Sequence, residues 1–211
     1  YYGPSSSKDL LSTIDQYHQV PATLKDIPAG NEFSYLETPA TKVLVAPYEA
    51  KQIYMAQISN LDKKYDPAIE PTRELYNEYF GGGMNSIVFQ EMRETRGLAY
   101  SAWASIMPPS YLKYPYVLRT QIATQNDKMI DAVTTFNDII NNMPESEAAF
   151  KLAKDGLTNR LRTERIIKGD IIWSYINAQD LGQNVDPRIK LYNDIQNMSL
   201  KDIVDFQKQW V

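Results

Sequence analysis

The order of the predicted strands and helices constrains the fold of this chain more than any other feature of its sequence. Residues that favour strands gather in two neighbouring groups, and the apolar residues between and after these groups follow helical spacing. Strands are predicted at Glu32–Thr38, Thr41–Ala46, Gln52–Ser59, Tyr100–Met107 and Tyr114–Ala123. Because strands and helices come in runs and do not alternate, the sequence indicates an α+β fold, with helices packed on one face of an antiparallel β-sheet.

Glycines and prolines mark the helices in the first half of the chain. Asp66-Pro67 begins a helix that Gly81-Gly82-Gly83 ends, and a second helix runs from about Asn85 to Arg96, before Gly97. The first of these helices presents four large apolar residues to the predicted core, namely Leu75, Tyr76, Tyr79 and Phe80.

The second half of the chain is predicted to be mostly helical. Thr124-Gln125-Asn126-Asp127 resembles a capping box, and Pro144 ends the helix that follows it. Three more helices are predicted over Ile171–Leu181, from Pro187 and from Ser199 to Trp210. Core positions are predicted at Ile130, Val133, Phe136, Ile139 and Ile140 in the helix before Pro144, and at Phe150, Leu157 and Leu161 in the helix after it.

Composition excludes several classes of function. The chain has one histidine and no cysteine, whereas a catalytic zinc site usually takes three protein ligands, so we expect no metal site in this chain. The net charge of −4 argues against nucleic-acid binding, which needs clustered Lys and Arg. No apolar run approaches the roughly 18 residues of a membrane span. The absence of cysteine fits a reducing or an oxidising compartment equally well.

The most informative segment runs from Phe80 to Ala102 and reads F-G-G-G-M-N-S-I-V-F-Q-E-M-R-E-T-R-G-L-A-Y-S-A. Taken alone, it predicts a glycine turn, a helix, a glycine stop and the start of a strand. A phosphate-binding loop would need Lys and Ser or Thr after the last glycine, and Met84-Asn85 stands there instead.

This segment resembles the second domain of insulinase-type zinc metallopeptidases, the family of pitrilysin and the mitochondrial processing peptidase. In that domain a small-residue turn precedes a helix that reads roughly S-x-L-F-x-x-L-R-E-x-x-G-L-x-Y, and Ser86 to Tyr100 follow this pattern. The family carries zinc on an H-x-x-E-H helix of another domain. That motif is absent here, because His18 is followed by Gln-Val-Pro-Ala.

The resemblance implies that this chain is the non-zinc half of a peptide-hydrolysing chamber. It implies zinc as a cofactor of the partner domain only, a zinc-bearing domain or subunit as partner, and a peptide as substrate. It also implies that Arg93 and Tyr100, seven positions apart, lie near the scissile bond of that peptide. Without the zinc motif the chain is not expected to be an enzyme on its own.

The physical chemistry of these two side chains suits that role. Water attacking a peptide carbonyl builds negative charge on the carbonyl oxygen, and a fixed phenol such as Tyr100 can donate a hydrogen bond to it. Arginine stays charged and offers a rigid fork of donors, so Arg93 is expected to hold the substrate backbone. The alternative is structural, since a cation often ends a helix and a tyrosine often begins a strand.

Residues 1–30 are predicted to be the end of a preceding repeat, or a connecting helix and linker, and residues 31–211 the non-zinc domain. The chain ends on a helix, which is interpreted as truncation before the last strand of that domain. The alternative function is a catalytically dead structural or partner-binding subunit of the same family. A free-standing ligand-binding domain is a third possibility.

Four other features are interpreted without a catalytic role. His18 is predicted to be partly buried at the border of an apolar helix face. Glu70, Glu74 and Glu78 are predicted to form a solvated face, with Arg73 relieving their repulsion. One further set is a basic stretch that is expected to face solvent, namely Arg160, Arg162, Arg165 and Lys168. The other is the group of tyrosines from Tyr111 to Tyr116, which are expected to pack or to lie in a loop between the two predicted strands.

Overall fold

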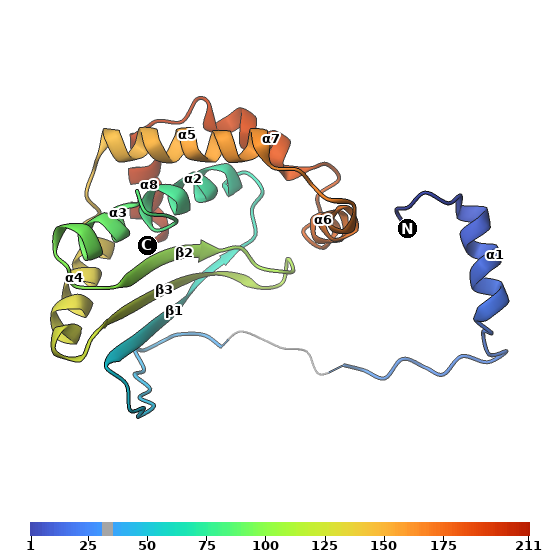
Figure 1. Cartoon of the computed structure of the whole chain (residues 1–211), viewed down its shortest axis with the longest axis horizontal. Coiled ribbons are helices and arrows are strands. Elements are labelled where there is room, and N and C mark those ends of the chain that lie inside the picture. The colour runs from blue at the N-terminus through green and yellow to red at the C-terminus, as the bar shows by residue number, and fades with distance from the viewer. Residues whose placement is uncertain (31–35) are drawn as a thin grey trace.

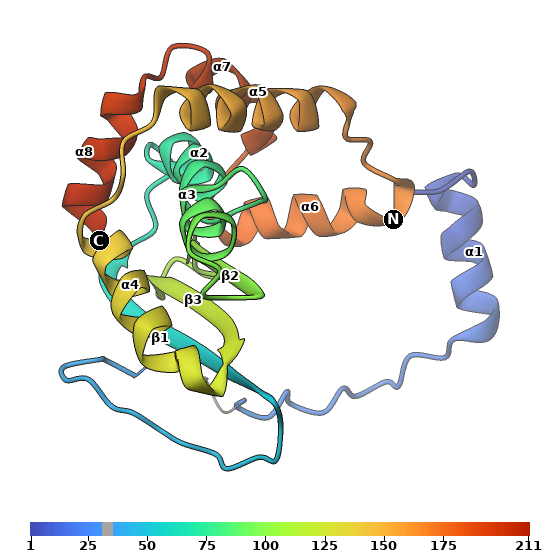
Figure 2. The ribbon, with the colours of Figure 1, turned by 60° about the vertical axis from the view of Figure 1, so that its left-hand side comes forward.

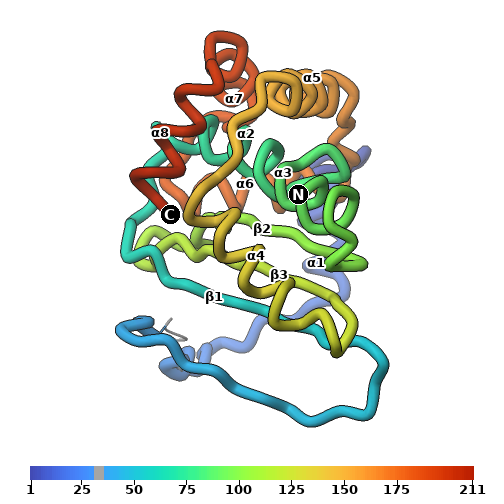
Figure 3. The backbone as a smooth tube through the Cα atoms, turned by 90° about the vertical axis from the view of Figure 1, so that its left-hand side faces the viewer, coloured from blue at the N-terminus to red at the C-terminus, as the bar shows by residue number. Residues whose placement is uncertain are grey.

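The computed structural model describes residues 1–30 and 36–211, and within these residues three strands form one antiparallel sheet (Figure 1). The strands are β1 (Gln52–Lys64), β2 (Ser101–Met107) and β3 (Pro115–Gln125), and β3 lies between the other two. The helical elements are α1 (Ser7–Tyr17), α2 (Glu70–Phe80), α3 (Ile87–Phe89), the π-helical turn η1 (Gln90–Thr95), the 3-10 turn η2 (Asn126–Lys128), α4 (Met129–Asn141), α5 (Glu147–Thr163), α6 (Lys168–Asp180), α7 (Pro187–Ile195) and α8 (Leu200–Trp210). Helices cover one face of the sheet, which confirms the predicted α+β class (Figure 3).

The core lies between the sheet and α2. All four of the predicted apolar residues of α2 are fully buried, and they meet the side chains that β2 and β3 point toward the helices. Behind α2, α5, α7 and α8 form a second layer (Figure 1). The Tyr76 ring packs at a tilt against Phe206 of α8, with 5.1 Å between ring centroids, so the C-terminal helix closes the core.

The glycine triplet has a packing role at the open edge of β2. A Cβ atom on Gly81 would lie 2.2 Å from the carbonyl oxygen of Ala104 in β2, which leaves room only for glycine. Four residues earlier, the Asn77 side chain donates to the Ile106 carbonyl and accepts from its N–H, at 3.0 and 2.8 Å. Asn77 and Gly81 thus cover the edge of β2 that pairs with no other strand of the described chain.

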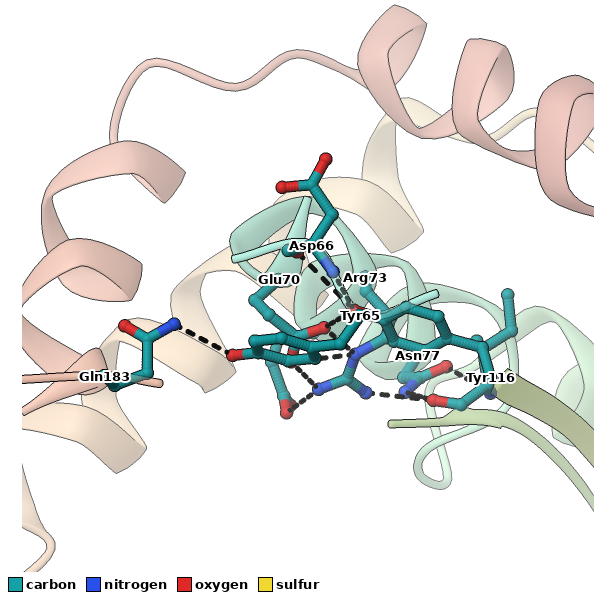
Figure 4. Close-up of polar contacts among 9 residues, drawn as sticks. Tyr65, Asp66, Glu70, Arg73, Asn77, Tyr116 and Gln183 are labelled. Atoms are coloured by element: carbon teal, nitrogen blue, oxygen red, sulfur yellow. Dashed lines mark hydrogen bonds and ion pairs between the residues drawn. The ribbon is translucent and has the colours of Figure 1, made fainter. Parts of the chain in front are cut away.

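A buried polar network ties α2 to both β2 and β3 (Figure 4). Arg73 is only 4% exposed, and its guanidinium donates to the Glu70 carboxylate at 2.8 Å and to the Ile106 carbonyl at 2.9 Å. Tyr116 of β3 donates to Glu70 at 2.6 Å. Burial alone would lower the pKa of Arg73, but hydrogen bonds and charge from Glu70 and Glu74 raise it, so the guanidinium stays charged.

The network corrects the prediction of a solvated acidic face on α2. Arg73 does pair with Glu70 and Glu74, but it is buried, and the Glu70 side chain is 19% exposed. The partners that draw this ion pair inward are distant in sequence, since Arg73 donates to the Ile106 carbonyl and Glu70 accepts from Tyr116. Burial of Tyr116 and the neighbouring Glu70 charge raise the pKa of this phenol, so it remains a donor.

Several predicted helix ends are confirmed. Asp186 caps α7 by accepting from the Arg188 N–H at 3.0 Å, with Pro187 in the first turn. Asp202 accepts from the Ser199 N–H at 2.8 Å as part of the capping box that begins α8. Gly182, after α6, adopts a φ of 68°, as expected of a glycine that ends a helix.

Other local predictions are wrong. Thr41–Ala46 does not form a strand. Of the first predicted strand, Leu36–Thr38 is not part of the sheet, and residues 32–35 lie outside the described residues. Thr124–Asp127 is no capping box, since α4 begins later, at Met129, and Ile130 is 80% exposed. His18 is exposed, because no other element within residues 1–30 and 36–211 covers the apolar side of α1.

Two helices carry apolar side chains that nothing in the described chain buries. Neither α1 nor α6 contains a buried residue, and both lie beside the body of the fold (Figures 1 and 2). On α6, Trp173 is 65% and Tyr175 is 63% exposed. None of the helices in the described part of the chain is long and apolar enough to cross a membrane.

Candidate functional site

The site is built on the helical segment that follows the glycine turn. Ser86 caps α3 by accepting from the Phe89 N–H at 3.4 Å, and the helix then widens into the π-helical turn η1. The Met92 carbonyl accepts two bonds, from Leu98 N–H at 2.8 Å and Ala99 N–H at 3.2 Å. Gly97 turns the chain with a φ of 57°. The helix therefore ends in a loop that folds back over its own last turn.

This loop brings Arg93 and Tyr100 together. The Arg93 guanidinium carbon lies 5.4 Å from the centroid of the Tyr100 ring and 5.1 Å from that of Phe89, within cation–π range of both. Tyr100 is 68% exposed, and the Arg93 side chain is 45% exposed. The two aromatic rings thus orient the guanidinium while its donors remain open to solvent.

Contacts from the end of β3 hold the loop in place. Thr124 donates from its hydroxyl to the Leu98 carbonyl at 2.5 Å, and the Lys128 ammonium donates to the Gly97 carbonyl at 3.0 Å. The Tyr100 N–H bonds to the Ala123 carbonyl at 2.8 Å, which joins the loop to the sheet. The position of Tyr100 is therefore fixed by β3 as well as by its own helix.

Arg93 and Tyr100 line an open hollow of about 290 Å³ at this end of the sheet. Its polar side chains come from β1, η1, the loop after η1, β3 and η2, and they are Gln52, Arg93, Tyr100, Thr124, Gln125 and Lys128. A concave surface with several converging donors is the usual setting of a ligand site. The structure brings the two predicted residues together in such a place.

Sequence reasoning missed three residues that shape this site. Thr124 and Lys128 line the hollow and hold its loop, and Phe89 packs against Arg93, but none of the three was predicted to belong to the site. The predicted antiparallel pairing of β2 and β3 could have located Thr124 and Lys128. Ser101 of β2 lies opposite Ala123 of β3, so the residues just before Ser101 lie beside the residues just after Ala123.

The remaining candidates do not form a second site of this kind. Within residues 1–30 and 36–211, no three His, Cys, Asp or Glu side chains come together in a way that could hold a metal ion. In the basic stretch, Arg160 pairs with Glu78 at 2.9 Å and Arg162 donates to Tyr192 at 2.8 Å. Tyr111 is half-exposed beside Tyr114, with 6.0 Å between ring centroids.

Comparison with known proteins identifies the family. The family model described as the peptidase M16 inactive domain matches residues 2–157, about three quarters of the chain. The chain belongs to this family. The resemblance seen in the segment from Phe80 to Ala102 is thereby confirmed, including its assignment to the inactive half of a zinc-protease family. No curated protein matches the sequence of this M16 inactive domain.

Solved structures share the fold of this M16 inactive domain at low sequence identity. A protease from Helicobacter pylori is 12% identical, with a TM-score of 0.68 over 99% of this chain and 50% of its own. A peptidase M16 inactive domain from Pseudomonas fluorescens is 16% identical, with a TM-score of 0.61 over 78% of this chain and 39% of its own. The periplasmic protease PqqL from Escherichia coli is 14% identical, with a TM-score of 0.60 over 99% of this chain and 23% of its own. The chain thus spans half or less of the length of these proteins.

Proposed function

We propose that this chain closes the peptide-binding chamber of a zinc metallopeptidase and positions a peptide for hydrolysis at a zinc site in another domain. The observation that carries the proposal is the exposed pair of Arg93 and Tyr100, held together at the mouth of a hollow by the loop after η1. A purely structural pair would be expected to be buried, whereas the Arg93 side chain is about half exposed and Tyr100 is mostly exposed.

Each side chain has a distinct task in this proposal. Tyr100 donates from its hydroxyl to the oxygen of the peptide carbonyl, on which negative charge grows as water attacks. Arg93 donates to neighbouring carbonyls of the peptide backbone, and its stacking between Phe89 and Tyr100 limits the entropy lost on binding. Zinc, bound by the partner domain, supplies the activated water.

The exposed helices support an interface with that partner domain. The chain corresponds to half or less of each of the three solved proteins named above, and two of those are described as proteases. The apolar residues of α1 and α6, among them Leu11, Trp173 and Tyr175, are available to pack on further protein. We assign residues 1–30 to a connecting segment and residues 31–211 to the non-zinc domain.

The same surfaces also fit the second candidate function, a catalytically dead subunit that binds a partner. The exposed face of α6 favours this candidate as much as the first, because both need an interface. The two differ in the partner: only a proteolytic complex carries H-x-x-E-H in the domain or subunit that this chain contacts. Hydrolysis that a chelator abolishes would support the first candidate.

The decisive experiment substitutes Tyr100 in the complete protein that contains the zinc-bearing half. Loss of one oxyanion donor costs about 3–4 kcal/mol, so Tyr100→Phe should lower kcat by about 100- to 1000-fold with little change in KM. Arg93→Gln should mainly raise KM. Tyr111→Phe is the matched control, since Tyr111 is exposed but lies in the β2–β3 connection, outside the hollow. Normal turnover by Tyr100→Phe would remove Tyr100 from this role.

A further inference from the structure

The hollow beside Arg93 has an uneven distribution of charge. Two of its side chains, Arg93 and Lys128, are cationic, and among the described residues that line it none carries a carboxylate. The chain as a whole has a net charge of −4, so this local surplus runs against its overall balance. A positively charged hollow in an acidic protein indicates a ligand group of negative charge.

Neither cation is strongly neutralised by the protein. Lys128 donates to a neutral acceptor, the Gly97 carbonyl, at 3.0 Å. Arg93 has a carboxylate neighbour, Glu94, but their closest atoms are 3.5 Å apart and both side chains are about half exposed. Exposed ion pairs of this type are weak, so a bound peptide can compete with Glu94 for the guanidinium.

The rest of the hollow suits a carboxylate. Gln52 of β1 and Gln125 of β3 lie opposite each other in the sheet, and both line the hollow, where their amide groups can donate hydrogen bonds. The volume of about 290 Å³ is at the low end for ligand sites, which suits one side chain or a chain terminus better than a long segment.

We propose that this hollow selects peptides that carry a carboxylate next to the segment held by Arg93 and Tyr100, and that Lys128 is the residue that determines this specificity. The inference rests on the proposed function, because it assumes that a peptide binds there. The carboxylate comes from an acidic side chain or from the free C-terminus of the peptide. In either case Lys128 donates to it, while Arg93 holds the peptide backbone.

The test measures direct binding of three labelled peptides to the full chain by fluorescence anisotropy at low salt. One peptide has blocked ends and a central Glu, one has the same blocked ends and Gln in its place, and one has Gln and a free C-terminal carboxylate. We expect a carboxylate-bearing peptide to bind about five- to tenfold more tightly than the blocked Gln peptide, with the preference shrinking as salt is added. The third peptide tells the two carboxylate sources apart.

Matched variants assign the preference to Lys128. Lys128→Gln should bind all three peptides with equal affinity, and Lys128→Arg should restore the preference. Lys151→Gln removes the same charge from α5, away from the hollow, and should retain the preference. Circular dichroism and thermal unfolding check whether Lys128→Gln is folded. If the loop needs a donor to the Gly97 carbonyl, Lys128→Arg supplies one and still tests the role of the positive charge.

The outcomes separate this inference from the proposed function. Equal binding of all three peptides by the wild-type chain, or a preference that survives Lys128→Gln, overturns the specificity and leaves peptide binding intact. Peptide binding that Arg93→Gln leaves unchanged, or no binding of any peptide, overturns the proposed function and the specificity with it. Loss of the preference in Lys128→Gln alone supports both.

Discussion

Replacing Gly81 with alanine tests whether α2 is held against the edge of β2 by a backbone contact. The added Cβ would lie 2.2 Å from the Ala104 carbonyl oxygen and 2.5 Å from the Ala104 nitrogen. Because both are backbone atoms in the middle of β2, no side chain can turn away, and the helix end must move by roughly 1 Å to reach an ordinary contact distance.

The expected cost follows from this displacement. Overpacking a tightly packed interior typically costs about 1–3 kcal/mol, and here the shift also strains the two hydrogen bonds between Asn77 and Ile106. Alanine recovers about 0.4–1 kcal/mol by restricting the unfolded chain. We therefore expect Gly81→Ala to lower the free energy of unfolding by about 2–3 kcal/mol.

Gly83→Ala is the matched control, two residues further along the same turn. The nearest atom to its added Cβ is Glu78 Oε1 at 4.0 Å, and Gly83 is not among the glycines with positive φ. Its substitution should be neutral or stabilise the chain by about 0.4–1 kcal/mol. Urea unfolding followed by circular dichroism measures both variants. If Gly81→Ala unfolds within about 0.5 kcal/mol of the wild type, or if both variants lose equal stability, the close approach to Ala104 is not what requires glycine.

Two further predictions concern polar groups that stabilise the fold. Arg73→Leu should lower the free energy of unfolding by about 3–5 kcal/mol, because it leaves the Glu70 carboxylate and the Ile106 carbonyl buried without the guanidinium. Thermal or urea unfolding measures this change, and a loss below about 1 kcal/mol would contradict the prediction. Hydrogen bonds from the Ser199 N–H and hydroxyl lower the pKa of Asp202 in the folded chain. The Asp202 carboxylate therefore stabilises the fold fully at pH values above its pKa in the unfolded chain, and this stabilisation is lost as the pH falls through its lower pKa in the folded chain. Asp202→Ala should therefore lower the free energy of unfolding by about 1 kcal/mol at neutral pH. Unfolding measured along a pH series should show this difference from the wild type becoming smaller in acid. A difference that does not change with pH would refute this role of the Asp202 carboxylate.

Local patterns in the sequence predicted the helices of the core well. In α2, four apolar residues at helical spacing are all fully buried, since one face of a single helix is set by its own sequence. The caps of α7 and α8 were predicted for the same reason, because a cap involves residues two or three positions apart. In α4 the predicted capping box, with Thr124 as N-cap, placed the helix start four residues before Met129, and the predicted core residue Ile130 is exposed while Ala132 is buried.

Features that depend on distant segments could not be predicted in this way. Thr41–Ala46 has the composition of a strand, but strands form only where another strand offers hydrogen-bond partners, and in the structure this segment is exposed and unpaired. Conversely, β1 continues to Lys64, beyond the predicted end at Ser59, because β3 pairs with it across a break in register after Asn60. Burial of Arg73 has the same origin, since its acceptor, the Ile106 carbonyl, is 33 residues away.

The candidate site combines both kinds of information. Arg93 and Tyr100 were found through a motif, and their seven-residue spacing alone would place them two turns apart along an uninterrupted helix, about 10 Å from each other. In the structure the Met92 carbonyl receives the N–H groups of Leu98 and Ala99, so the chain reverses and the Tyr100 ring reaches the guanidinium. The reversed segment ends where the Tyr100 N–H donates to the Ala123 carbonyl of β3. The position of Tyr100 beside Arg93 therefore depends on β3. The spacing identifies the residues, but the sheet creates the geometry that a peptide would meet.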